Sequence, residues 1–144
     1  MKTVTQILKD KGTSIWSIPL GATVLDALQL MAEKNIGAVL VCEDNLIHGI
    51  FSERDYARKI VLAGKKSRET PIRDVMSSRV ICVTPDRTLE ECMAIMTEKR
   101  VRHIPVLDGE RLIGVISIGD VVKGVISQQQ FEIEQLHKYI RESR

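Results

Sequence analysis

Two short segments carry the groups in this sequence that are best placed to do chemistry. Ser52 is followed three residues later by Asp55, and Ser117 is followed in the same way by Asp120. At a helix start, a hydroxyl and free N–H groups can hold phosphate oxygens, and a carboxylate one turn later can accept hydrogen bonds from both vicinal hydroxyls of a ribose. The same spacing also makes a capping box, which satisfies free N–H groups of the helix. Alone, either segment favours the cap, although both roles can coexist.

Both segments lie in a longer internal repeat. The sequence GIFSERD at 49–55 is matched by GVISIGD at 114–120, and the same offset of 65 residues carries Thr23 to Thr88 without a gap. A repeat of this length indicates one supersecondary unit that packs against a copy of itself. Gly49 and Gly114 begin the matched stretch, where the missing Cβ lets the backbone approach a ligand or a neighbouring strand closely.

The pattern around the two segments predicts the elements that position them. Capping boxes at Thr23 and Thr88 open a helix in each repeat, and apolar residues at i, i+3, i+4 and i+7 then form one buried stripe. Two apolar runs follow in each repeat, at 38–42 and 47–51 and again at 104–107 and 112–116, with polar turn residues between them that predict hairpins. Each repeat therefore reads as strand, helix, strand, strand, helix, and the last helix begins at Ser52 or Ser117.

The repeat sets the expected domain boundaries. We predict a first unit over residues 1–66, a second unit over 67–127 and a C-terminal amphipathic helix over 128–144. Residues 63–71 are polar and rich in turn formers, which is typical of a surface linker. The final helix is expected to dock either on the body of the protein or on another subunit, because five apolar side chains recur there at roughly helical spacing: Phe131, Ile133, Leu136, Tyr139 and Ile140.

Composition excludes several classes of function. The 144 residues are 44% hydrophobic, carry a net charge of +2 with acids and bases interspersed, and include only 3% aromatic residues. A nucleic-acid surface needs a sustained basic face or stacking aromatics, so we expect no nucleic-acid partner. No apolar run approaches the roughly 18 to 20 residues that cross a bilayer. We therefore expect a soluble, cytoplasmic protein without a membrane partner.

The reactive side chains do not form a recognisable catalytic pattern. Cys42, Cys82 and Cys92 are widely spaced among apolar residues and include no Cys-x-x-Cys pair, so we interpret them as reduced, buried thiols. We find no nucleophile–base arrangement in a recognisable context, no metal-ligand spacing and no glycine-rich phosphate loop of the Walker or dinucleotide type. The sequence predicts a protein that is not an enzyme and holds no metal.

Its two Gly-to-Asp turns, each preceded by a hairpin, make the chain resemble a tandem pair of CBS domains, also called a Bateman module, over nearly its whole length. The resemblance implies an α/β (α+β) fold of two pseudo-symmetric β-α-β-β-α units packed sheet to sheet, plus the C-terminal helix. It also implies adenosine-containing ligands in two clefts between the units. This reverses the preference for a simple cap, and we expect ligand contacts from Gly49, Ser52, Asp55, Gly114, Ser117 and Asp120.

The resemblance further places basic residues against ligand phosphates. Arg102 can offer a bidentate fork to a phosphate and His103 a pH-sensitive donor. The matching positions of the first repeat are Gly37 and Ala38. Arg54 is a third basic candidate, and because its counterpart is a glycine the two clefts should differ in charge.

Main-chain groups before the first helix of each repeat are expected to meet the adenine edge, again by resemblance. In this chain they belong to Ser17, Ile18 and Thr84. The first repeat has one more residue than the second between its proline and its helix, and it lacks a proline matching Pro105. The adenine contacts of the two repeats are therefore expected to differ.

The function implied is that of a regulatory sensor, which binds an adenine nucleotide and signals by a conformational shift to an unidentified protein target. NAD and AMP are the first candidates, ADP and ATP follow, and S-adenosylmethionine is less favoured because the basic residues suit a phosphate-bearing ligand. The alternative is a structural module for homodimerisation or protein interaction whose clefts stay unoccupied. Both hypotheses predict a homodimer.

Overall fold

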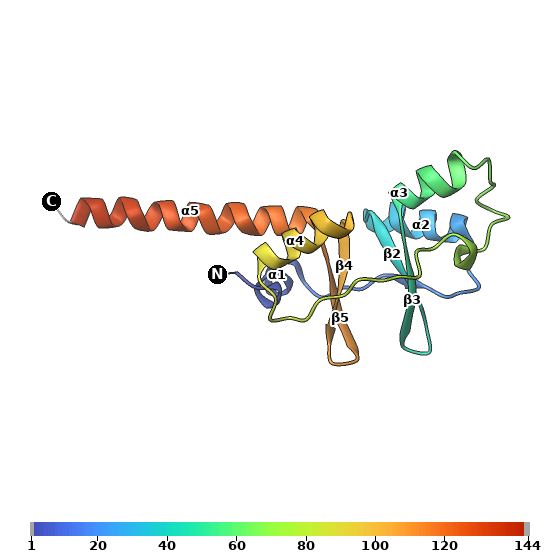
Figure 1. Ribbon diagram of the computed structural model, residues 1–144, viewed down its shortest axis with the longest axis horizontal. Helices are drawn as coiled ribbons and strands as arrows, with labels where there is room; N and C mark the ends of the chain where they lie inside the picture. The colour runs from blue at the N-terminus through green and yellow to red at the C-terminus, as the bar shows by residue number, and fades with distance from the viewer. Residues whose placement is uncertain (1, 143–144) are drawn as a thin grey trace. The chain divides into compact units, whose positions relative to one another are not determined.

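The computed structural model describes residues 2–142 and divides into two compact units. The first-repeat unit is Trp16–Val80, and the second-repeat unit joins the residues up to Ile15 with those from Ile81 onward. Figure 1 shows that each unit combines a small sheet with helices, which is the predicted mixed α/β architecture. The hydrophobic core is correspondingly double, with one buried cluster in each unit.

The first-repeat unit contains the predicted strand, helix and hairpin in that order. Its elements are β1 (Ser17–Ile18), α2 (Val24–Lys34), β2 (Ala38–Glu43), β3 (Leu46–Ser52), α3 (Glu53–Asp55), the π-helical turn η1 (Tyr56–Val61) and the 3-10 turn η2 (Ile72–Asp74). The sheet order is β1-β2-β3, with β1 parallel and β3 antiparallel to β2. The predicted stripe of α2 packs against the sheet, because Val24, Ala27 and Met31 are buried with Val39, Val41 and Phe51.

The second-repeat unit repeats the hairpin but loses most of its first strand. Its elements are α1 (Val4–Lys11), α4 (Leu89–Lys99), β4 (His103–Asp108), β5 (Arg111–Ser117) and α5 (Ile118–Glu142). The counterpart of β1 is a single parallel bridge between Val83 and Val106. In the first-repeat unit the Leu40 N–H donates to the Trp16 carbonyl at 3.3 Å. The matching residue is Pro105, which has no N–H, so this ladder cannot lengthen in the same way.

The segments that lead into the two repeats are exchanged. Leu89, at the start of α4, donates its N–H to the carbonyl of Lys2 at 3.1 Å. The matching Val24, at the start of α2, donates its N–H to Thr70 at 2.9 Å. The chain before the first repeat thus packs on the second, and the chain before the second packs on the first. The predicted boundaries follow the repeat, whereas the compact units follow this packing.

The C-terminal helix is a continuation of the second repeat rather than a separate element. α5 runs unbroken from Ile118 to Glu142, across the boundary predicted at residue 128. No proline interrupts this stretch, and after Gly124 it contains no glycine, so nothing local ends the helix. Among residues 2–142 no helix is both long enough and apolar enough to cross a lipid bilayer.

Candidate functional site

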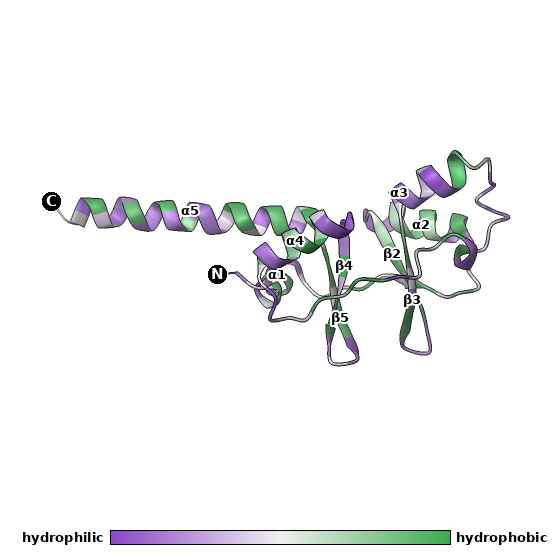
Figure 2. Cartoon of the chain, in the orientation of Figure 1, coloured by the Kyte–Doolittle hydropathy of each residue, from purple (hydrophilic) through white to green (hydrophobic). Residues whose placement is uncertain are grey.

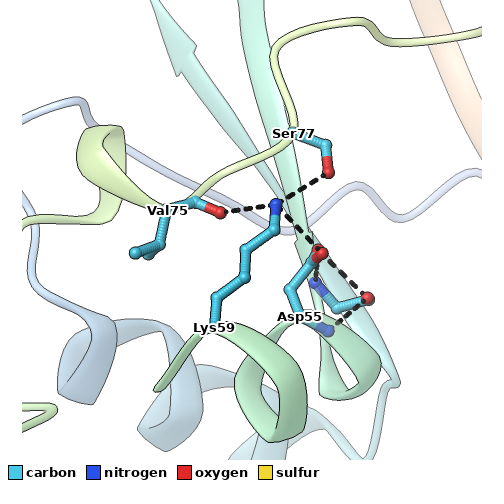
Figure 3. Close-up of polar contacts among 5 residues, drawn as sticks. Asp55, Lys59, Val75 and Ser77 are labelled. Atoms are coloured by element: carbon cyan, nitrogen blue, oxygen red, sulfur yellow. Dashed lines mark hydrogen bonds and ion pairs between the residues drawn. The ribbon is translucent and has the colours of Figure 1, made fainter. Parts of the chain in front are cut away.

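The first Ser–Asp turn joins β3 to α3 and is a fully formed capping box. Asp55 Oδ2 accepts hydrogen bonds from the Ser52 N–H at 2.9 Å and from Ser52 Oγ at 3.1 Å. The Asp55 N–H donates in return to Ser52 Oγ at 3.2 Å (Figure 3). The cap foreseen as the simpler interpretation is therefore present, and it leaves Oδ1 of Asp55 for other partners.

That second oxygen is held by a lysine from the same helical segment. Lys59 Nζ lies 3.3 Å from Asp55 Oδ1, four residues further along the chain. The same ammonium donates to the carbonyl of Val75 at 2.9 Å and to Ser77 Oγ at 3.3 Å, as Figure 3 shows. Lys59 thus ties the turn to the segment that follows η2.

The second turn repeats this geometry with a lysine from a distant part of the chain. Asp120 Oδ2 accepts from the Ser117 N–H at 2.8 Å, and the Asp120 N–H donates to Ser117 Oγ at 3.2 Å. Lys11 Nζ, at the end of α1, lies 2.6 Å from Asp120 Oδ2 and 2.6 Å from the Val115 carbonyl. Burial raises the pKa of the Asp120 carboxyl, but the hydrogen bonds from Lys11 and Ser117 outweigh it, and the pKa lies below its ordinary value. Asp120 is therefore ionised at neutral pH.

The residues predicted to meet phosphates lie beside these turns. The first helical N–H after Ser117, on Ile118, donates to the Arg102 carbonyl at 2.8 Å, and His103 pairs with Ser117 across the hairpin. Arg102 is exposed and His103 is half-buried. In the first repeat Gly37 and Ala38 occupy the same two places: the Glu53 N–H donates to Gly37 at 3.1 Å, and Ala38 pairs with Ser52.

The two turns consequently differ in their basic groups. Arg54 is exposed on α3 within the first turn, where the second turn has the exposed Gly119. The second turn instead has Arg102 and His103 at its side. A pocket of about 210 Å³ also adjoins it between α1 and α5, and its lining includes three ammonium groups, those of Lys2, Lys11 and Lys123.

The residues predicted to meet adenine lie on the other side of the central strand. Ser17 and Ile18 form β1, which pairs with β2 at Leu40 and Val41, while β3 and its turn lie across β2. Ser17 is exposed and Ile18 is buried. Thr84 follows the Val83 bridge in the second-repeat unit, and its hydroxyl donates to the Asp86 carboxylate. The structure places these residues beside the middle strand and gives them no hydrogen bond to the turns.

Gly49 and Gly114 make close approaches to protein side chains. A Cβ on Gly49 would lie 2.5 Å from Met76 Sδ and 3.0 Å from the carbonyl oxygen of Ser77. A Cβ on Gly114 would lie 2.7 Å from Leu8 Cδ2. Each glycine therefore makes room for the exchanged leading segment of its unit, and its contact with a ligand stays a prediction.

The two lysines that hold the carboxylates were missed in the sequence. Lys59 had a local signal, because an acid followed four residues later by a base on a helix predicts a side-chain pair. Lys11 had none, since it comes from the exchanged segment and is 109 residues from Asp120.

The cysteines differ from the prediction in one respect. Cys92 is buried, but Cys42 and Cys82 are only half-buried. Burial raises the pKa of all three thiols, which keeps them protonated and poorly nucleophilic at neutral pH. Within residues 2–142 no cluster of His, Cys, Asp or Glu has the geometry of a metal site.

Comparison with known proteins gives a consistent family. The family model described as CBS domain matches residues 10–62 and 72–127. The CBS domain-containing protein CBSX3, mitochondrial, of Arabidopsis thaliana is 38% identical over 149 residues, which cover 96% of this chain and 72% of that protein. A solved protein with CBS domains from Burkholderia ambifaria is 52% identical, covers 89% of this chain and 96% of its own, and superposes with a TM-score of 0.85.

A more distant neighbour shares the fold alone. It is a CBS domain pair solved in complex with 5′-methylthioadenosine and S-adenosyl-L-methionine, at 18% identity and a TM-score of 0.78. The similarity covers 89% of this chain and 98% of that one.

Proposed function

Since the chain belongs to the CBS domain family, we propose that it is a regulatory module that binds an adenine nucleotide at its Ser–Asp turns. The observation that carries the proposal is the second turn, where the ionised Asp120 carboxylate meets the Lys11 ammonium and the backbones of Arg102 and His103 adjoin the same helix start. A carboxylate suits a ribose diol, and the cationic groups suit phosphate. The distant CBS pair that binds two adenosine compounds supports the class of ligand.

Binding must compete with contacts that the turns already make. A ribose diol at Asp120 displaces the ammonium of Lys11, and the freed lysine can then pair with a ligand phosphate. Lys11 also holds the Val115 carbonyl, so its release loosens the end of α1. At Asp55 the exchange involves Lys59, which ties the turn to Val75 and Ser77.

These exchanges provide the signal. A ligand shifts a conformational equilibrium only if it binds the two arrangements with different affinity. Here the two arrangements differ in whether each lysine holds its carboxylate or the ligand. The change is passed to a segment outside the turn, either α1 or residues 75–77, where a protein target can sense it.

Phosphate-bearing adenine compounds are the favoured ligands. NAD and AMP are the first to test, followed by ADP and ATP. Arg54, Arg102 and His103 can bind a phosphate group, whereas they would add little affinity for a ligand without one. S-adenosylmethionine carries a positive charge and no phosphate, so we expect it to bind more weakly at these turns.

Calorimetry of the full chain with each compound tests the proposal. Asp120→Ala should weaken the nucleotide that binds by roughly ten- to hundredfold, the effect of losing hydrogen bonds to a charged group. Asp55→Ala tests the first turn in the same way. Asp26→Ala is a matched control, because Asp26 caps α2 through the same two bonds, at 2.9 and 3.2 Å to Thr23, but lies in no Ser–Asp turn.

The outcomes separate binding from capping. Equal affinity in Asp55→Ala, Asp120→Ala and Asp26→Ala would refute the site. A thermal shift absent for every adenine compound would refute the function, since saturation at a hundredfold the dissociation constant stabilises by about 2.7 kcal/mol. That result would favour the alternative, a homodimerisation or interaction module, which the exposed apolar side chains of α5 support.

A further inference from the structure

The C-terminal half of α5 has no other element of its unit alongside (Figure 1), and it carries exposed apolar residues. Val121 and Val125 face the core of the second-repeat unit. Figure 2 shows apolar patches recurring along α5 to its far end. The exposed members at heptad-like spacing, here called the α5 seam, are Val122, Ile126, Ile133, Leu136 and Ile140.

The spacing of the seam is that of a coiled coil. From Val122 the steps to the next seam positions are four, three, four, three and four residues, and the only polar position is Gln129. Isoleucine occupies the three a positions, 126, 133 and 140, and leucine occupies the d position 136. β-Branched residues at a with leucine at d favour two parallel strands.

The α5 seam cannot be covered by its own unit. A straight helix without a break between Ile118 and Glu142 does not fold back on the body from which it projects. The flanks of the helix also do not suit an anionic membrane surface, because Glu132 and Glu134 offset the bases of the tail.

We propose that the α5 seam pairs with the same seam of a second copy of this chain, as a parallel two-stranded coiled coil in register. Polar complementarity supports the second copy: Glu132 occupies a g position and His137 the e position of the next heptad, these two positions face each other across a parallel dimer, and an imidazole N–H can donate to a carboxylate. Gln129 would meet its own copy, and two amides can donate and accept in turn. An apolar partner would leave that amide without this match.

The helix is already ordered where the pairing begins. Val121 anchors the first half of α5 in the unit core, so a second copy meets a formed helix rather than a disordered tail. The seam from Val122 to Ile140 is about 27 Å long at the usual rise per residue, between two and three heptads. We therefore expect a dimer whose population depends on protein concentration.

Sedimentation equilibrium of the full chain tests the pairing. Leu136→Glu places two like charges inside the paired seams, and we expect it to raise the dissociation constant at least tenfold. Phe131→Glu is the matched control, because Phe131 and Leu136 are both 61% exposed but Phe131 lies on the opposite face of the helix. Circular dichroism checks that both variants remain folded.

Three results would overturn the proposal: a monomeric wild type at all concentrations, an unchanged Leu136→Glu variant, or equal weakening by Phe131→Glu.

The parallel register has its own test. Under mild oxidation, two copies of Leu136→Cys should form a disulfide and two copies of Phe131→Cys should not. Cross-linking of Leu136→Cys to Val122→Cys in a mixture would contradict the parallel register. Nucleotide affinity plays no part in these readouts.

Discussion

The two Ser–Asp turns are the same in their local bonds and different in what holds them. Both carboxylates accept the N–H of the serine three residues before, at 2.9 Å in the first repeat and 2.8 Å in the second. Asp55 is then held by Lys59 of its own helical segment, whereas Asp120 is held by Lys11 of α1. Duplication preserved the cap, and the exchanged packing supplied each turn with a different cation. A ligand at one turn would therefore disturb a different segment from a ligand at the other.

The largest expected effect tests whether the leading segments are exchanged. Ile7 on α1 and Ile72 on η2 are both buried, so Ile7→Ala and Ile72→Ala should each lower the free energy of unfolding by about 2–5 kcal/mol. Hydrogen exchange should show faster exchange in β4–β5 for Ile7→Ala and in β2–β3 for Ile72→Ala. The exposed Leu62→Ala serves as control. Faster exchange in β2–β3 for Ile7→Ala and in β4–β5 for Ile72→Ala would instead mean that each leading segment packs on its own repeat.

The next effect compares the two glycines. Gly49→Ala pushes a methyl group against the backbone carbonyl of Ser77 as well as Met76, and overpacking of this kind typically costs about 1–3 kcal/mol. Gly114→Ala meets only the end of the flexible Leu8 side chain, so its cost should be smaller. Urea unfolding of the two variants measures the difference. A larger loss for Gly114→Ala would show that α1 is the more rigid leading segment.

The smallest effect concerns the two lysines and depends on pH. The folded-state pKa of Asp120 is lowered, so its contribution to stability is present above the unfolded pKa of about 3.9 and is lost as pH falls through the folded value. Lys11→Met should cost up to about 1 kcal/mol at pH 7, and Lys59→Met about 0.3–0.5 kcal/mol. Unfolding midpoints from pH 7 to pH 3 check both.

The deficit of Lys11→Met relative to wild type should shrink as pH falls toward the lowered folded pKa of Asp120, below which the carboxyl is protonated in both proteins. A deficit that stays constant over this range would mean that the Val115 carbonyl, rather than Asp120, is the partner of Lys11 that matters.

Local pattern was enough to predict most of the fold. Both hairpins and the boxes at Thr23 and Thr88 follow from spacing within about ten residues, and the structure confirms them. The first strand of the second repeat is short because Pro105 has no N–H to donate to it. The proline was visible in the sequence, but the strand beside it was not. α5 runs unbroken across the boundary predicted at residue 128, because its two halves bury different amounts of surface although the helix itself does not stop.

The candidate site could be predicted from the sequence only in part. The 65-residue pattern located the two turns, and the resemblance to CBS domain pairs pointed to Arg102 and His103 beside the second turn. Lys11 could not be found in this way, since the contact with Asp120 joins the beginning of the chain to its last helix. The sequence pattern of a repeat carries no information about contacts with segments outside that repeat.

The exchanged leading segments also set an order for folding during translation. Trp16–Val80 is continuous, so the first-repeat unit can be completed as soon as this stretch leaves the ribosome. α1 must wait for β5, which is synthesised about 100 residues later, or on the order of 5–20 s at usual elongation rates. During that interval the apolar face of α1, with Val4, Ile7 and Leu8, is newly made and without its native cover. Residues 16–80 can thus mature first, and α1 matures together with the second repeat.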